Sequence, residues 1–128
     1  MSYKIVFLDI NESIKKLGNN NREDLYQCTR KYWKLSPQHA SQADYIVGFA
    51  DNEIKTIYRA SKWKKIADCR DLLNDTEVIH NPNYKDTRYA FEGKSVNETE
   101  FKKISAELTK DIPKSRQNPV HYNFKALR

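Results

Sequence analysis

Two apolar segments joined by a short polar turn constrain the fold of this chain more than any other local feature. Residues 44–50 (DYIVGFA) are apolar at consecutive positions, and residues 54–64 follow the turn Asp51-Asn52-Glu53 with a second strand-like pattern. Consecutive apolar residues indicate a strand that is buried on both faces, and Asp and Asn are typical of hairpin turns. The segment therefore predicts a β-hairpin inside a packed domain.

The rest of the chain predicts a mixture of strands and short helices. Residues 3–10 are apolar on both faces of a strand, whereas residues 22–35 repeat their apolar positions with the period of a helix. Strands are predicted at 3–10, 77–79, 87–92 and 120–124, helices at 22–35, 36–42, 68–75 and from Asn97 to Pro113, and a turn-rich connection at 11–21. Because no long regular helix separates the strands, we expect an α+β fold with a small mixed or barrel-like sheet.

Length favours one globular domain, and composition favours a surface that can bind a polyanion. The 128 residues are enough for a single core, so we expect one domain over 1–128. The net charge is +6, with 8 Tyr, 5 Phe and 2 Trp, and nucleic acid offers both phosphates and base faces to such a surface. Many small basic domains bind no nucleic acid, so charge alone does not decide the function.

The N-terminus predicts a cytoplasmic protein. The apolar run from Ile5 to Leu8 stops at Asp9, which is too short for a signal peptide, and no segment is long and apolar enough for a membrane span. Cys28 and Cys69 do not make a disulfide framework, and we expect both to be reduced and buried.

The charge is divided into blocks along the chain. Residues 1–29 are neutral, residues 30–66 carry 8 basic and 3 acidic groups, residues 67–100 carry 4 and 8, and residues 101–128 carry 7 and 2. If the two basic blocks meet in space, they form one basic face that can hold Trp33, Trp63 and Tyr122. A solvated surface with these rings in the core is the alternative.

Two segments combine cations with aromatic rings and are the strongest candidates for binding. Arg30, Trp33 and Lys34 are close together on the helix predicted at 22–35, and Arg59 and Trp63 share one face of the strand predicted at 54–64. A ring can stack on an unstacked base while Lys or Arg holds the neighbouring phosphates. Structural packing of Arg on Trp would give the same pattern.

The chain resembles a known group of domains in several segments. RKYWKLS, ADYIVGFADNEIKTIYRASKW, RYAFEGKSV and QNPVHY are similar to small bacterial and phage domains of the PUA-like type, close to the ASCH and EVE groups. The resemblance covers about Leu25 to Tyr122. It implies a PUA-like pseudo-barrel whose concave face holds nucleic acid, including a modified or flipped base.

The resemblance also implies roles for particular side chains. Arg30 and Arg88 would contact phosphate or a base edge, Trp33 or Trp63 would stack, and Asn118 would read an edge through its amide. The other matching positions are Phe91 and Tyr122. A domain of this kind without an effector domain acts by binding or through a partner protein.

Two other functions remain open. The basic surface could face an acidic protein, as in a phage or mobile-element factor that acts on a nucleic-acid enzyme. Asp44, Glu53 and Lys55 have the residue types of a metal-dependent nuclease, although a strand of this length separates the two carboxylates widely. We expect no cofactor, because no phosphate-binding glycine loop and no spaced His or Cys metal motif occurs.

Overall fold

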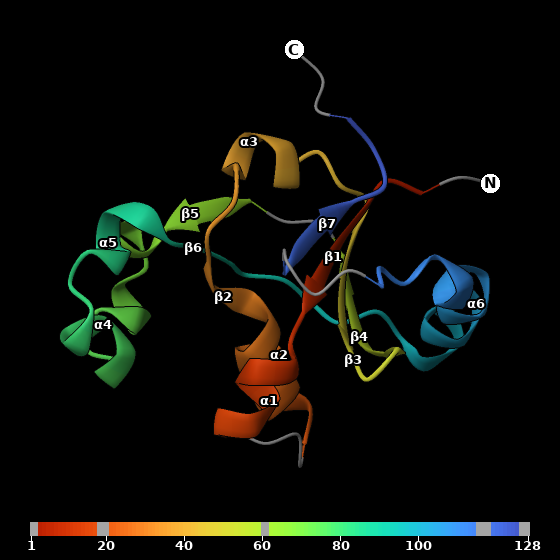
Figure 1. The fold of residues 1–128 in the computed structure, drawn as a ribbon, viewed down its shortest axis with the longest axis horizontal. Helices are drawn as coiled ribbons and strands as arrows, with labels where there is room; N and C mark the ends of the chain where they lie inside the picture. Colours follow the sequence, from red (N-terminus) through yellow and green to blue (C-terminus); the bar gives the residue numbers. More distant parts are fainter. Residues whose placement is uncertain (1–2, 18–20, 60–61, 115–118, 126–128) are drawn as a thin grey trace.

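The chain folds into two β-sheets with short helices around them (Figure 1). The structure is a computed structural model that describes residues 3–17, 21–59, 62–114 and 119–125. Both helices and sheets are present, so the predicted α+β class is confirmed. The two sheets remain separate and do not close into a barrel, which corrects the barrel-like geometry expected from the sequence.

The larger sheet has four strands in the order β4–β3–β1–β7. Its strands are β4 at Glu53–Arg59, β3 at Tyr45–Ala50, β1 at Ile5–Asp9 and β7 at Val120–Tyr122. β1 pairs in parallel with β3, and the other pairs are antiparallel. β3 and β4 form the predicted hairpin through Asp51 and Asn52, whose φ angles of 52° and 62° suit a two-residue turn of this hand.

Both faces of the larger sheet are buried, which explains the apolar runs in β1 and β3. Ile5 and Phe7 face α6 (Glu98–Leu108), which covers one side of the sheet. Val6 and Leu8 face the opposite core, where α2 (Arg22–Arg30), α3 (Pro37–Ala40) and the smaller sheet lie. The predicted central strand at 3–10 is therefore confirmed.

The smaller sheet brings together three strands from distant parts of the sequence. β6 (Tyr89–Phe91) lies between β2 (Lys31–Trp33) and β5 (Trp63–Lys65), and both pairs are antiparallel. The second strand of the hairpin thus ends at Arg59, and Trp63 belongs to another sheet. The helix predicted at 22–35 likewise ends at Arg30, where the backbone becomes extended and pairs with β6.

Residues 66–88, between β5 and β6, form a separate projection that we call the arm (left in Figure 1). The arm contains the 3₁₀-helices η1 (Ile66–Asp68) and η2 (Arg70–Leu72) and the short helices α4 (Thr76–His80) and α5 (Tyr84–Thr87). Its own small core consists of buried apolar side chains, namely Ile66, Cys69, Leu72 and Val78, with Ala90 of β6. The strand predicted at 77–79 is therefore wrong, because this segment is part of α4.

Helix caps follow the sequence closely. The side chains of Asn21, Ser36 and Asn97 each accept a backbone N–H bond at the start of α2, α3 and α6. The segment predicted as a turn-rich connection contains a helix instead, α1 (Asn11–Leu17), whose first N–H donates to Asp9 Oδ1. A 3₁₀-turn η3 (Thr109–Asp111) follows α6. Within the part of the chain that is described, no helix combines the length and the apolar content needed to span a bilayer.

α2 approaches the larger sheet most closely at Gly48 of β3. A Cβ atom at this position would lie 2.8 Å from Thr29 Oγ1 and 2.9 Å from Thr56 Cγ2. Thr29 is fully buried on α2, and its hydroxyl donates to the Leu25 carbonyl. A glycine is required here because two buried side chains leave no room for a methyl group.

We expect Gly48→Ala to lower the free energy of unfolding by roughly 1–3 kcal/mol, because the added methyl overpacks the contact. Urea titration of the variant measures the change. Thr29→Ala removes one of the two clashing groups, so its effect and that of Gly48→Ala should be less than additive in the double variant. Strict additivity would show that the close approach at Gly48 does not limit stability.

Candidate functional site

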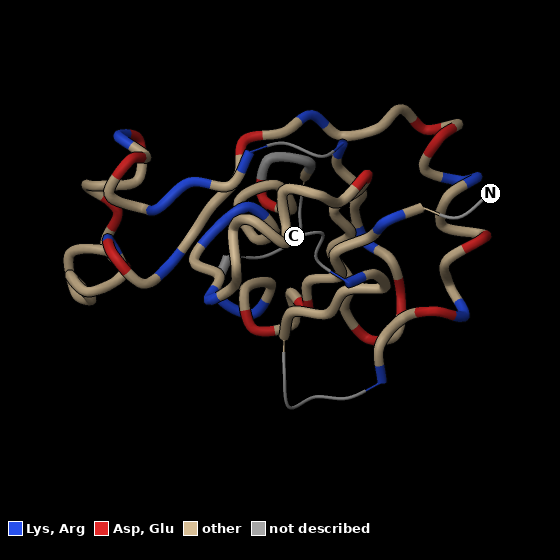
Figure 2. The backbone as a smooth tube through the Cα atoms, turned by 90° about the horizontal axis from the view of Figure 1, so that it is seen from above, with Lys and Arg blue, Asp and Glu red and all other residues tan. Residues whose placement is uncertain are grey.

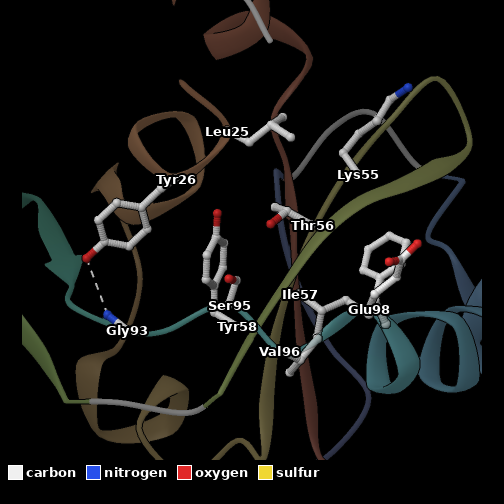
Figure 3. A pocket seen from close by; sticks show the side chains of 11 residues that line it. Leu25, Tyr26, Lys55, Thr56, Ile57, Tyr58, Gly93, Ser95, Val96 and Glu98 are labelled. Atoms are coloured by element: carbon white, nitrogen blue, oxygen red, sulfur yellow. Dashed lines mark hydrogen bonds between the residues drawn. The ribbon is translucent and has the colours of Figure 1, made fainter. Parts of the chain in front are cut away.

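A pocket of about 550 Å³ lies between α2, β4 and the segment that joins β6 to α6. We call it the tyrosine pocket, because Tyr26 and Tyr58 line one side of it (Figure 3). The remaining lining residues are Leu25 of α2, Lys55, Thr56 and Ile57 of β4, Gly93, Ser95 and Val96 of the joining segment, and Glu98 and Phe101 of α6.

Backbone pairing at the edge of β4 fixes one wall of the tyrosine pocket. Tyr58 and Ser95 form an isolated antiparallel bridge, and the Arg59 N–H donates to the Lys94 carbonyl at 3.1 Å. The Val96 N–H donates to the Ile57 carbonyl at the same distance. Because α6 begins immediately afterwards, this segment pairs only with the end of β4, and Lys55 and Thr56, earlier in β4, line the pocket.

An aromatic cluster holds the two tyrosine rings in place. The ring centroids of Tyr26 and Tyr58 are 5.5 Å apart, and both rings contact Phe91 of β6. The Gly93 N–H donates to the Tyr26 hydroxyl at 3.3 Å, which ties the ring to the opposite wall (Figure 3). Tyr58 is buried, whereas Tyr26 is partly exposed, so Tyr26 is the ring that a ligand can contact.

A second hollow of about 390 Å³ adjoins the tyrosine pocket and shares Tyr26 and Gly93 with it. We call it the arginine hollow. Its other lining residues are Gln27 and Arg30 of α2, Asp71 of the arm, and Glu92 and Lys94. We call the two adjoining spaces the groove. Tyr26 and Gly93, joined by their hydrogen bond, lie between its aromatic part and its charged part.

Arg30 is the charged centre of this groove. Its Nε donates to the Phe91 carbonyl at 3.1 Å, and its Nη1 donates to Asp71 Oδ2 at 2.8 Å. The guanidinium carbon lies 5.5 Å from the centroid of the Tyr26 ring. The hydrogen bond from Arg30 holds the pKa of the Asp71 carboxyl below its usual range.

The next two residues also bind the arm. Lys31 Nζ lies 2.9 Å from Asp75 Oδ2. Burial acts to raise the pKa of Asp75, but the bond from Lys31 and the nearby Tyr32 hydroxyl lower it overall. Tyr32 has a φ of 61°, a left-handed conformation that a side chain with a Cβ adopts at a cost, and its ring lies against Tyr84. A cleft of about 210 Å³ borders these residues.

Both tryptophans that the sequence placed in the binding site are core residues. Trp33 and Trp63 are each only 6% exposed. The Trp33 indole N–H donates to the Thr29 carbonyl, and the Trp63 ring packs on Phe91 behind the tyrosine pocket. The prediction that either ring stacks on a base is therefore wrong, because the interior of this small domain takes up both.

The remaining predicted residues do not converge on one site. Arg59 is 2.6 Å from Glu100, Arg88 lies over the Tyr84 ring, and the Tyr122 ring stacks on His39 at 3.6 Å. Lys34 is exposed after β2. Asn118 lies outside the described residues. Of the seven predicted residues that the structure describes, Arg30 is the one that lines the groove.

Part of the second basic block lies far from the first. α6 and the arm with β5 lie at opposite ends of the molecule (Figure 1), so the lysines of α6 are far from those of β5. The two blocks do meet at β7, where the Tyr122 ring stacks on His39. Figure 2 shows basic residues at both ends, with acidic residues beside them. The acidic block folds onto the first basic block, through Arg30–Asp71, Lys31–Asp75 and Arg59–Glu100.

The geometry also separates the residues of the nuclease hypothesis. Glu53 pairs with Ala50 at one end of the hairpin, whereas Asp44 precedes the pair of Tyr45 and Arg59 at the other end. Asp44 accepts the Lys4 N–H at 2.8 Å, and Lys55 pairs with Glu53 at 3.0 Å. Among the described residues, no three His, Cys, Asp or Glu side chains gather into a metal site.

Sequence reasoning missed the two tyrosines that form the pocket. Tyr26 stands four residues before Arg30 on the same helical face, so the two side chains lie side by side. This spacing is the signal that could have identified Tyr26. Tyr58 could not be found in this way, because its place depends on the segment that pairs with β4 from beyond the arm.

Comparison of this chain with family models, with curated proteins and with solved structures finds no match. The resemblance to PUA-like domains therefore stays a prediction.

We expect the attachment of the arm to weaken in acid. The folded-state pKa values of Asp71 and Asp75 lie below the usual value of about 4. As the pH falls, both carboxylates are therefore protonated in the unfolded chain before they are protonated in the folded protein. Stability from both pairs is complete above about pH 5 and is lost as the pH falls through the folded-state pKa values. Thermal unfolding between about pH 2 and 7 measures this loss.

Asp75→Asn keeps an N-cap residue for α4 but removes the titrating group. The variant should be less stable at neutral pH and should lose less stability in acid than the unmodified protein. Asp86→Asn, which changes an exposed aspartate of the same arm, is the matched control. Equal pH profiles for the two variants would contradict a role of the Lys31–Asp75 pair.

Proposed function

We propose that this protein is a cytoplasmic, non-catalytic nucleic-acid-binding domain that receives one unstacked base in the tyrosine pocket. The observation that carries the proposal is the position of Tyr26, which borders a pocket with polar and apolar lining on one side and the Arg30 guanidinium on the other. A nucleotide has the same two parts, a planar apolar ring and an adjacent anion.

The lining of the tyrosine pocket suits a base. The Tyr26 ring provides a face for stacking, and Leu25 and Phe101 add apolar contact. The hydroxyls of Thr56 and Ser95 can each donate and accept, as the edge of a base requires. Lys55 and Glu98 at the far end supply one charge of each sign (Figure 3).

The same geometry favours recognition of one or a few nucleotides over coverage of a long duplex. Four of the eight basic residues of the 30–66 block are already paired with carboxylates, which reduces the charge that this block offers to a polyanion. Affinity must then come mainly from the base, with few phosphates neutralised. Binding should weaken with salt, but with a shallow slope.

A protein-interaction module is the second candidate. Its support is Ile79 of α4, a large apolar side chain that is 60% exposed on the arm. A single exposed side chain is much smaller than the contiguous apolar patches of several hundred Å² that mark protein interfaces. The groove therefore favours nucleic acid.

We expect Tyr26→Leu to weaken binding of a single-stranded oligonucleotide by about tenfold or more, since stacking of one base contributes about 1–3 kcal/mol. Fluorescence anisotropy with labelled RNA and DNA oligonucleotides measures the affinity. Tyr26→Phe keeps the ring and should bind nearly as well as the unmodified protein.

Tyr3→Leu is the matched control, because Tyr3 is partly buried against Tyr45 on the other side of the larger sheet. It should leave the affinity unchanged. If Tyr26→Leu and Tyr3→Leu bind equally well while both remain folded, the tyrosine pocket is not the binding site.

A further inference from the structure

The two side chains of the Arg30–Asp71 ion pair differ greatly in exposure, which indicates that another anion can replace Asp71. The Arg30 side chain is 3% exposed, whereas the Asp71 side chain is 55% exposed. Arg30 sits on α2 and is buried among the aromatic cluster, so the guanidinium cannot leave its place. Asp71 comes from η2 of the arm and can return to water at little cost, because it is already half hydrated.

The guanidinium is oriented independently of Asp71. Its Nε donates to the Phe91 carbonyl of β6, and the Tyr26 ring lies beside it. A guanidinium carries five N–H donors, and the bonds to Phe91 and Asp71 use two of them. Arg30 therefore stays aimed at the arginine hollow when Asp71 moves, and it can bind an oxyanion through two parallel N–H groups.

The position of Asp71 matches the place where a bound nucleotide would carry a phosphate. Tyr26 and Gly93 line both the arginine hollow and the tyrosine pocket, so they alone separate the two spaces where these adjoin. A base stacked on Tyr26 thus has its backbone next to the hollow. Lys94, exposed on the opposite side, adds a second cation there.

We propose that Asp71 pairs with Arg30 in the unbound protein, where its carboxylate substitutes for a phosphate, and that a phosphate of the bound nucleic acid replaces this carboxylate on the Arg30 guanidinium. The proposal rests on the proposed function and adds the group recognised beside the base. Two charged acceptors compete for one buried guanidinium, so ligand binding and attachment of Asp71 oppose each other. Because Lys31–Asp75 and the small core of the arm persist, the exchange loosens η2 without detaching the arm.

Inorganic phosphate tests the exchange without requiring base recognition. Asp71→Asn removes the competing carboxylate, so phosphate should stabilise this variant against thermal unfolding at lower concentration than it stabilises the unmodified protein, by about tenfold. Glu92→Gln is the matched control, because Glu92 lines the same hollow and the change in charge is the same. If phosphate stabilises the two variants at the same concentrations, the proposal is overturned, because the loss of any nearby negative charge would then have the same effect.

A measurement on the unmodified protein covers the case in which Asp71→Asn does not fold. Phosphate should increase hydrogen exchange at the amides of Leu72 and Asp75, which bond to the Cys69 and Leu72 carbonyls within this part of the arm. Chloride at the same ionic strength should leave hydrogen exchange at these two amides unchanged. Unchanged exchange in phosphate would contradict the displacement of Asp71.

The two proposals fail separately. If Asp71→Asn lowers the phosphate concentration needed for stabilisation but Tyr26→Leu leaves the oligonucleotide affinity unchanged, the anion site at Arg30 is supported and the base-binding role of the tyrosine pocket is contradicted. If Tyr26→Leu weakens oligonucleotide binding but phosphate stabilises Asp71→Asn and Glu92→Gln at the same concentration, the base-binding role of the tyrosine pocket is supported and the exchange at Arg30 is contradicted.

Discussion

One buried guanidinium connects the parts of this molecule. Arg30 ends α2, bonds to the Phe91 carbonyl in the smaller sheet and pairs with Asp71 of the arm. An arginine this deeply buried is tolerated only when hydrogen bonds replace its hydration. The bond to Phe91 fixes the end of α2 against the smaller sheet, and a second acceptor, Asp71 in the unbound protein, must face the remaining N–H groups.

The division of charge along the sequence takes its meaning from these contacts. Two basic blocks on either side of an acidic one suggested a single basic face, but opposite charges attract, and the acidic block lies against the first basic block. Three basic residues of the first block are therefore neutralised by contacts within the molecule. In the proposed binding mode, recognition depends on shape and on a few placed groups, and long-range attraction of a polyanion is the smaller contribution.

Local features of the fold could be predicted from the sequence, and tertiary ones could not. The hairpin at Asp51 and Asn52 depends on neighbouring residues and is confirmed, and the helix caps at Asn21 and Asn97 are local features of the same kind. Trp63 failed as a predicted ligand contact because the hairpin strand ends at Arg59 and the chain changes sheets, which no local pattern records. The tyrosine pocket escaped prediction for the same reason, since its walls come from segments some thirty residues apart.

Tyr32 shows how closely the groove and the arm depend on each other. It follows Arg30 and Lys31, so three consecutive side chains reach the arm, and its left-handed backbone turns the ring toward Tyr84. Such strain persists only where the surroundings over-determine it, here through the Tyr84 contact and burial in the small core of the arm. Arg30, Lys31 and Tyr32 thus connect the end of α2 and the start of β2 to three places on the arm, namely Asp71, Asp75 and Tyr84. The arm is best understood as one wall of the groove, because the same short stretch of backbone positions Arg30 and holds the arm.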